Sequence, residues 1–567
     1  MMEGTSKRPE KFVFATLATV VVLIALCLSF PLELPLGESF WDTYIYIDGA
    51  YRLSVGQEIY TDFHAPVGPL NYILFDLLSS LFPHGNVALI IQWCMMLITV
   101  PIIAVICWFA LERGAFAGFA LLMPYLLFSI LPFNIMSWNA FPGVDGFAYY
   151  NRHSAVLLYL LVATLFFVRS QPALIGLISA LLLALAFIKI NGFAVAGLIL
   201  AMAVVTRRLA IATSLIVAAI CLGLVACLEL LTGSVSAYLH SVFRLLDNNE
   251  TVLLSNLVTT VSARFDVIFA AALLAAYLFA SRFWGGRNLL AAFDSDHPRE
   301  PAPNRLDQDW LWLLALIIAD VLFESQNFGG AAFVSVWPFL LVLFLATAPQ
   351  RRAQLSPLIV LIALVSLPTV TKMLHSTARA AATSIRDMSI ETENLPPSMS
   401  FSAKVLTVEA ADRARPVMAG GRDTYEGYAR SNILPTYWLY FDHRFQVTVL
   451  KTMDEVIEAI RQRETRLGRH YEVIDLRDFA NPIAAVMGRT PAGGVSIGGD
   501  PYRTVLPLTD AEAQALSQTD IVLLPTCPVT AARKKLLDDY QRAYAGFSRI
   551  TLTDCFEALE NPRYAAQ

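Results

Sequence analysis

The sequence predicts a polytopic α-helical membrane protein with about eleven transmembrane helices, followed by a small soluble α/β domain. Of its 567 residues, 56% are hydrophobic and only 15% are charged, whereas about a quarter of the residues of a soluble domain are charged. Long apolar runs separated by short loops extend to about residue 372, and sequence of ordinary polarity follows. We therefore expect a membrane domain over 1–374 and a second domain over 375–567.

A helix needs roughly 20 apolar residues to cross a bilayer, and fewer when it is buried in a bundle. The predicted spans are 12–30, 87–111, 115–133, 153–169, 172–188, 192–206, 209–231, 265–282, 309–323, 331–349 and 355–372. The first of these is long enough to span and lacks a convincing signal-peptide cleavage site, so we expect it to be retained. The apolar segment 68–82 is short and flanked by glycine and proline, which predicts a helix at the membrane surface.

Lysine and arginine orient this arrangement, because they are more frequent in cytoplasmic loops. With a cytoplasmic N-terminus, thirteen cations are inside: Lys7, Arg8, Lys11, Arg113, Arg169, Arg207, Arg208, Arg282, Arg287, Arg299, Arg305, Arg351 and Arg352. Five are outside: Arg52, Arg152, Lys189, Arg244 and Arg264. Counting 68–82 as a full span would reverse this bias. The outer face then carries the polar, motif-like loops and the C-terminal domain.

The outer loops of the membrane domain, residues 1–374, contain no P-loop, no dinucleotide-binding glycine fingerprint, no H-E-x-x-H and no G-x-S-x-G. The Gly-rich stretch "GGVSIGGD" at 493–500 lacks the spacing of a phosphate-binding motif, and we interpret it as a plain loop. Nucleotide-activated donors are cytoplasmic, so an enzyme working on the outer face needs a donor that the membrane delivers. A lipid-linked donor meets that requirement.

The first outer loop, residues 31–86, carries the most specific pattern. Asp42 follows the first span, "YRLSVGQEIYTDF" occupies 51–63, and "GPLNYIL" occupies 68–74. Later pieces are "YYNRHS" at 149–154, "FIKINGF" at 187–193 and "ESQNFGG" at 324–330. Over about 12–372 the chain resembles the GT-C superfamily of membrane glycosyltransferases. This group uses polyprenyl-phosphate sugars and includes the protein mannosyltransferases and the aminoarabinose transferases of lipid A.

The resemblance implies an inverting displacement, in which a carboxylate takes the proton of the acceptor hydroxyl. Asp42 is the preferred base, by its position after the span. The family often has Asp-Glu where this chain has Asp-Thr, so Asp48 is the second candidate, with Asp145 and Asp62 behind it. Asp42 could instead cap a helix, and Asp62 could cap a turn. Six residues separate Asp42 from Asp48, so the two would not share a helix face cleanly.

The leaving phosphate needs cationic partners. Arg152, Lys189 and Arg244 are the candidates, with snorkelling to the membrane surface as the alternative role. Candidate substrate-binding residues combine amides, carboxylates and aromatic rings. They are Asp62, Tyr44, Tyr51, Asn151, Asn191, Glu324, Gln326 and Asn327. An aromatic belt at the interface would also account for the tyrosines.

The C-terminal domain alternates helical and strand-like patterns. Helices are predicted at 452–464 and 529–546, and strands at 471–479, 520–525 and 547–559. This alternation predicts an α/β domain. Its function is open between covering the active site, recruiting the acceptor and assembly. Cys527 and Cys555 would pair if the domain is exported, although spacing alone does not decide it.

The sequence therefore predicts a glycosyltransferase in the bacterial inner membrane, with its active site and C-terminal domain in the periplasm. Its partners would be the bilayer, a polyprenyl-phosphate sugar and a glycan, lipid or protein acceptor. A net charge of −5 gives no basic footprint for nucleic acid. Mg²⁺ or Mn²⁺ would suit the phosphate, but no carboxylate cluster requires a metal. A lipid-linked-glycan transporter, a surface-polysaccharide ligase or polymerase, and a scaffold remain the alternatives.

Overall fold

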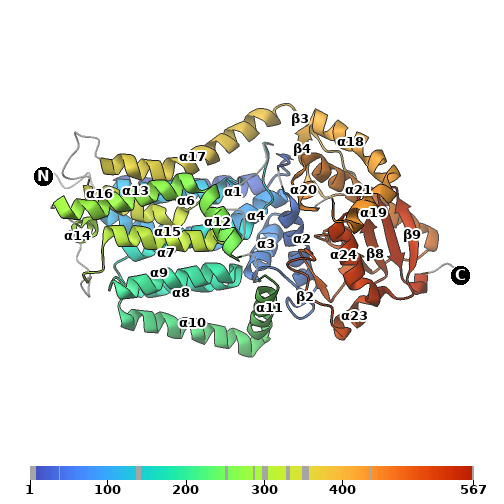
Figure 1. Cartoon of the computed structure of the whole chain (residues 1–567), viewed down its shortest axis with the longest axis horizontal. Coiled ribbons are helices and arrows are strands. Elements are labelled where there is room, and N and C mark those ends of the chain that lie inside the picture. The colour runs from blue at the N-terminus through green and yellow to red at the C-terminus, as the bar shows by residue number, and fades with distance from the viewer. Residues whose placement is uncertain are drawn as a thin grey trace.

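The computed structural model is an elongated molecule, with a bundle of long helices at one end and an α/β domain at the other (Figure 1). The structure describes residues 8–37, 39–135, 142–249, 253–284, 288–295, 304–326, 332–347, 357–433 and 436–564. The N-terminal end of the chain lies at the free end of the bundle, and the C-terminus lies in the α/β domain (Figure 1).

Within the described part of the chain, twelve helices occupy the eleven predicted spans, because the span 87–111 is divided between α4 and α5. These helices are α1 (Arg8–Leu28), α4 (Val87–Cys94), α5 (Met96–Ala110), α6 (Ala115–Ile130), α7 (Tyr149–Phe167), α8 (Gln171–Ile188), α9 (Ile190–Val205), α10 (Ile211–Thr232), α13 (Phe265–Ser281), α15 (Asp309–Ser325), α16 (Trp337–Thr347) and α17 (Pro357–Ser384). By length and composition, five helices in the described residues could cross a membrane, or six if α12 (Leu253–Ala263) and α13 form one bent span. Shorter apolar helices accompany them, so the count of eleven crossings stays a prediction.

Helix α7 is the centre of the bundle. All of its residues are buried, and α5, α6, α8, α9 and α16 pack around it. Its N-terminal residues "YYNRH" lie at the end of the bundle that faces the α/β domain, so a polar sequence is buried there. A buried polar segment of this kind needs partners for its side chains, and these partners form the candidate site.

Several predicted inner cations within the described residues contact α14 (Leu289–Ser295), which lies at the end of the bundle away from the α/β domain (Figure 1). Asp294 on α14 binds Arg169 at 2.6 Å and Arg208 at 2.9 Å. Arg208 also binds Asp307 at 2.6 Å. The two ends of the bundle therefore differ in the way that the loop charges predict. The compartment that each end faces stays a prediction.

Between the bundle and the domain lie α2 (Trp41–Ser54), α3 (Leu70–Leu81) and α11 (Ser234–Asn249) (Figure 1). Helices α2 and α3 are in close contact at Gly49, where an added Cβ would lie 2.5 Å from the Tyr72 ring. The predicted surface helix 68–82 corresponds to α3. Its exposed residues Ile73, Leu77 and Leu81 are four residues apart, so they form one apolar face, as expected of a helix lying on a membrane.

The α/β domain contains a five-stranded sheet in the order β6-β5-β8-β10-β9. Its strands are β6 (Thr490–Pro491), β5 (Val473–Leu476), β8 (Ile521–Pro525), β10 (Phe556–Glu560) and β9 (Ser548–Thr553). The predicted helices at 452–464 and 529–546 are found in α21 (His443–Leu467) and α24 (Ala531–Tyr540). The predicted strand at 547–559 is a hairpin of β9 and β10. Cys527 and Cys555 form a disulfide.

Two short strand pairs join the first outer loop to the domain. Strand β1 (Leu34–Pro35) pairs with β4 (Phe401–Lys404), which also pairs with β3 (Asp387–Ser389). Strand β2 (Phe63–His64) pairs with β7 (Val495–Ser496). The loop and the domain therefore fold as one unit, which the sequence did not reveal. Helix α17 continues from the bundle to Ser384 (Figure 1), so the expected boundary at 374 falls within a helix.

A buried cation fastens α2 to the domain. Arg52 has no exposed surface. It donates from Nε to Asp48 Oδ1 at 2.8 Å and from Nη1 to the carbonyl oxygen of Ala492 at 2.7 Å. Gln57 donates to the carbonyl oxygen of Pro491 beside it. Asp48 is buried as well. Water therefore does not stabilise either charge, and each charge is stabilised by the other.

We expect Arg52→Met to destabilise the protein by about 3–5 kcal/mol, because removal of one partner leaves a buried charge unpaired. The thermal unfolding midpoint in detergent, with proteolytic release of the α/β domain, measures this loss. The control is Arg444→Met, which removes an exposed pair with Asp442 and should cost about 1 kcal/mol or less. Equal losses in the two variants would contradict the assignment.

Candidate active site

Asp42 lies in the first turn of α2 and is 3% exposed. Its Oδ2 accepts a hydrogen bond from the backbone N–H of Ala148 at 2.7 Å. Ala148 precedes α7 and has a left-handed backbone, with φ of 56°. The carboxylate therefore connects the N-termini of two helices that come from distant parts of the sequence.

Glycines allow this close approach between the start of α2 and the segment before α7. The N–H of Gly37 donates to the carbonyl oxygen of Val144 at 3.0 Å. A Cβ atom at Gly146 would lie 2.4 Å from the Cα of Phe40, closer than real Cβ atoms approach. The two backbones are in direct contact, so a larger residue at Gly146 would move Asp42 away from α7.

Arg152 and Lys189 lie beside this carboxylate. Arg152 projects from the first turn of α7, and its guanidinium lies 4.3 Å from the centre of the Tyr149 ring. Its Nε and Nη1 are buried and have no hydrogen-bond partner among the described residues. Lys189 ends α8, and its Nζ donates to Asn151 Oδ1 at 2.7 Å. A buried arginine with unpartnered nitrogens indicates a place for an anion.

The motif "GPLNY" positions the turn that carries Lys189. The N–H of Gly68 donates to the carbonyl oxygen of Ile188 at 3.0 Å, and Asn71 Nδ2 donates to the same oxygen at 2.8 Å. A Cβ atom at Gly68 would lie 2.1 Å from the carbonyl oxygen of Phe187. Asn71 also accepts a hydrogen bond from Tyr46 on α2 at 2.8 Å. Asn71 was not among the predicted site residues, although it lies within a motif that the sequence singled out.

Burial and the neighbouring charges set the protonation of Asp42 and Lys189. Burial raises the pKa of Asp42 to about 6, while the Ala148 N–H and the charges of Lys189, Arg152 and Arg503 act to lower it. Burial and Arg503 lower the pKa of Lys189 to about 7, against the opposing effect of Glu324 and Asp42. Near pH 7 Asp42 is therefore mostly ionised, and Lys189 is about half protonated.

Two further predicted residues border this group. Glu324 is 4% exposed at the end of α15, interacts electrostatically with Lys189 and Arg264, and has an Oε2 without a partner among the described residues. Both polar side-chain atoms of Asn191 are also buried without a described partner. Gln326 directly follows α15. Asn327 lies outside the described residues. Glu324 and Asn191 could therefore bind a polar ligand.

Other predicted residues lie elsewhere on the first loop. Asp48 is ion-paired with Arg52, and burial raises the pKa of its carboxyl to about 6. The charges that act on it also include Asp475 and Arg477 of the α/β domain. Asp62 is exposed, and its Oδ2 accepts from the N–H of Glu58 at 2.8 Å. These contacts favour a structural role for Asp48 and a turn for Asp62.

Arg244 and the two tyrosines contact the α/β domain or lie near its charges. Arg244 donates to the carbonyl oxygen of Pro507 at 3.4 Å. The charge of Arg489 acts on Tyr51. Tyr44 lines a cavity between α2 and the domain. The contacts of these three residues therefore do not join them to the group around Asp42.

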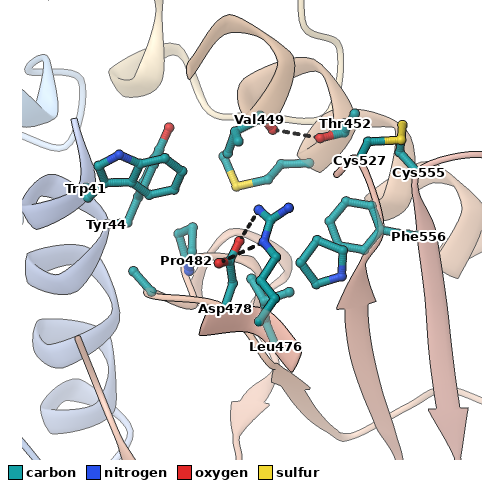
Figure 2. Close-up of a pocket in the computed structure, with 14 residues that line it drawn as sticks. Trp41, Tyr44, Val449, Thr452, Leu476, Asp478, Pro482, Cys527, Cys555 and Phe556 are labelled. Atoms are coloured by element: carbon teal, nitrogen blue, oxygen red, sulfur yellow. Dashed lines mark hydrogen bonds and ion pairs between the residues drawn. A yellow bond between two sulfur atoms is a disulfide. The ribbon is translucent and has the colours of Figure 1, made fainter. Parts of the chain in front are cut away.

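Figure 2 shows the cavity next to Tyr44, with Trp41 beside it on α2. Across the cavity, Arg533 binds Asp478 at 2.6 Å, and the Cys527–Cys555 disulfide lies at the edge (Figure 2). The cavity volume is about 20 Å³, which is room for a water molecule and not for a sugar. We therefore assign this cavity to the interface between α2 and the domain.

The described residues contain no group of three or more His, Cys, Asp or Glu side chains that could hold a metal ion. Near Asp42, the groups available to an anion are instead Arg152 and Lys189, with Arg503 of the α/β domain acting on both Asp42 and Lys189. The sequence did not predict a position near Asp42 for Arg503, because no recognised motif includes this residue.

No protein-family model and no curated protein sequence matches the chain. Two solved structures are similar to it, both crystal structures of ArnT from Cupriavidus metallidurans, one in the apo state and one bound to undecaprenyl phosphate. Each is 14% identical and covers 98% of this chain and 99% of its own, with TM-scores of 0.42 and 0.41. Donor, acceptor and catalytic residues must be inferred from the site itself.

The buried carboxyl of Asp42 makes folding stability depend on pH. Its folded-state pKa of about 6 exceeds the ordinary value of 3.8. The stabilisation from its protonation is therefore fully present below pH 3.8 and is lost as pH rises through 6. We expect Asp42→Asn, whose amide oxygen can still accept from Ala148, to gain about 3 kcal/mol relative to the wild type between pH 4 and pH 7.5.

Thermal unfolding midpoints of the two proteins in detergent, measured across this pH range, test the expectation. The control is Glu58→Gln, which neutralises an exposed acid of the same loop and should show no such trend. A constant difference between Asp42→Asn and the wild type at every pH would mean that the carboxyl titrates normally.

Proposed function

We propose that this chain is an inverting glycosyltransferase that moves a sugar from a polyprenyl-phosphate donor to an acceptor hydroxyl. The observation that carries the proposal is that a buried carboxylate, Asp42, lies near a buried arginine, Arg152. The Nε and Nη1 atoms of this arginine have no partner among the described residues. A carboxylate supplies a general base, and an unpartnered guanidinium supplies a phosphate site. The group lies at the end of an apolar bundle, where a lipid-linked phosphate would arrive.

In this mechanism the acceptor hydroxyl attacks the anomeric carbon from the face opposite to the phosphate. Asp42 takes the hydroxyl proton as the new carbon–oxygen bond forms. The hydrogen bond from Ala148 holds one carboxylate oxygen at 2.7 Å, so the rotation of the carboxylate is restricted. A base whose pKa of about 6 lies near the working pH is well matched to this proton transfer.

The bond between the anomeric carbon and the phosphate oxygen breaks as the new bond forms, and its electron pair leaves with the polyprenyl phosphate. Arg152 and protonated Lys189 would stabilise the charge that develops on this oxygen. Asn151 and the Tyr150 ring hold the Lys189 ammonium, at 2.7 Å and 4.9 Å. Glu324 would accept hydrogen bonds from sugar hydroxyls, and Asn191 could both accept hydrogen bonds from them and donate hydrogen bonds to them.

We place this reaction on the outer face of a bacterial inner membrane. The cation distribution between the two ends of the bundle supports that orientation. The Cys527–Cys555 disulfide supports an oxidising compartment for the α/β domain, because disulfides are rare in the cytosol. The acceptor in this proposal is a glycolipid, a polysaccharide or a protein.

We expect Asp42→Asn to lower kcat by about 10²- to 10⁴-fold, the usual contribution of a general base. The assay uses purified protein in native-like vesicles with total lipid extract, and mass spectrometry follows the loss of polyprenyl-phosphate sugars and the gain of one sugar mass on a product. Glu58→Gln is the matched control and should keep full activity. Donor consumption by Asp42→Asn at the wild-type rate would exclude Asp42 as the base and leave the transferase reaction intact. No consumption by folded wild type would refute the transferase.

The pH dependence of kcat/KM should be a narrow bell. Activity rises as Asp42 loses its proton near pH 6 and falls as Lys189 loses its proton near pH 7. Lys189→Arg, which keeps a cation that does not deprotonate in this range, should remove the alkaline limb and leave the acid limb in place. An alkaline limb that survives in Lys189→Arg would exclude Lys189 as its origin.

A further inference from the structure

The Gly-rich stretch 493–500, expected to be a plain loop, is one of the parts of the α/β domain that contact the first outer loop. The N–H of Gly494 donates to the carbonyl oxygen of Asp62 at 2.7 Å, and the N–H of Ile497 donates to that of His64 at 2.9 Å. These bonds flank the β2–β7 pair. The stretch is therefore fixed to the loop that carries Asp42.

Gly498 brings this stretch against α2. Its φ is +67°, in the left-handed region that glycine tolerates. A Cβ atom here would lie 3.0 Å from Ile45 Cδ1 and 3.1 Å from Pro66 Cγ. Ile45 is three residues after Asp42 and therefore lies on the neighbouring turn of the same helix. The glycine permits a contact that a larger residue would push apart.

A tight turn follows and presents Arg503. The carbonyl oxygen of Asp500 accepts from the N–H groups of Arg503 at 3.1 Å, Thr504 at 2.9 Å and Val505 at 3.1 Å. Asp500 Oδ1 accepts from the N–H of Tyr502 at 3.0 Å. This bonding fixes the backbone from which the Arg503 side chain projects. Arg503 is exposed and lies close enough to Asp42 and Lys189 to interact with both charges.

Three cations act on Asp42, namely Arg152, Lys189 and Arg503. Glu324 also acts on Lys189, and Asp500 interacts with Arg503. A bound anion would be stabilised by every cation that lies near it. Arg152 and Lys189 project from the bundle, while Arg503 comes from the α/β domain. An anion between these groups would be held from both parts of the molecule.

We propose that Arg503, presented by the turn after the Gly-rich stretch, is a third cation of the donor-phosphate site, which makes the α/β domain part of the active site. This inference rests on the proposed transferase function. The electron pair of the breaking bond passes to the phosphate oxygen, and the acceptor proton passes to Asp42. Arg503 transfers no proton; it stabilises the phosphate as its charge increases. The exposure of Arg503 places it on the solvent side of the site, across from the bundle.

The first test measures binding of undecaprenyl phosphate in detergent micelles to the full-length protein. We expect Arg503→Gln to weaken binding about tenfold, near the lower end for a charge-assisted contact, and Arg503→Lys to recover part of the loss. Arg466→Gln, which removes an exposed arginine of α21, is the matched control and should bind as the wild type does. Circular dichroism and the thermal midpoint confirm that each variant is folded.

The second test is the pH profile of kcat/KM, which a purely structural role would not move. Arg503 lowers the pKa of Asp42 and also lowers the pKa of Lys189. Arg503→Gln should therefore shift both limbs to higher pH, so that the whole bell moves in one direction. Charges facing these two groups from other elements, namely Arg152 on α7 and Glu324 on α15, are unchanged in the variant.

The outcomes separate this inference from the proposed function. Weaker binding together with an upward shift of both limbs supports a role for Arg503 in the site. A folded Arg503→Gln that binds and turns over like the wild type overturns the role of Arg503 and leaves the transferase intact. A folded wild type that neither binds the lipid phosphate nor consumes any lipid-linked sugar overturns the proposed function and, with it, this inference.

Discussion

The burial of charge on α2 is the constraint on which the rest of the structure depends. This one helix carries Asp42, Asp48 and Arg52 at 3%, 1% and 0% exposure, and water solvates none of them. Each charge therefore needs a partner in the protein. Asp42 is satisfied from the side of the bundle by Ala148, while Arg52 is satisfied from the side of the domain by Ala492. Contacts from both the bundle and the domain therefore stabilise the charges of α2 in the folded protein.

This constraint explains why the candidate site is built from segments far apart in the sequence. The proposed base comes from α2, one cation from α7, another from the junction of α8 and α9, and the Arg503 turn from the α/β domain. Backbone contacts at Gly146, Gly68 and Gly498 bring these segments together. At each contact a glycine, which has no side chain, lets its backbone lie directly against a neighbouring segment. These close contacts limit the relative motion of the residues of the candidate site. The short sheets between loop and domain serve the same purpose.

Hydropathy was sufficient to predict the helices of the bundle, while Asp42, Arg152 and Lys189 were selected with the help of the family resemblance, and their roles stay predictions. These features depend on the composition of one segment at a time. Arg503, Asn71 and the structural pairing of Asp48 were not accessible in this way. Strands β2 and β7 are two residues each, too short for any alternating pattern to predict their pairing. The position of Tyr44 at the interface with the domain depends on that same docking, so the sequence alone could not predict it (Figure 2).

The order of synthesis gives the loop–domain pairing a consequence for assembly. The N–H of Phe40 bonds to Gln446, which is 406 residues later in the chain, and the partner of Arg52 is 440 residues away. Chains grow from the N-terminus, and domains fold as they emerge. The first outer loop must therefore wait, with β1 and β2 unpaired and Arg52 without its Ala492 partner, until nearly the whole polypeptide has been made. A chain that terminates early could insert its helices and still never form the site.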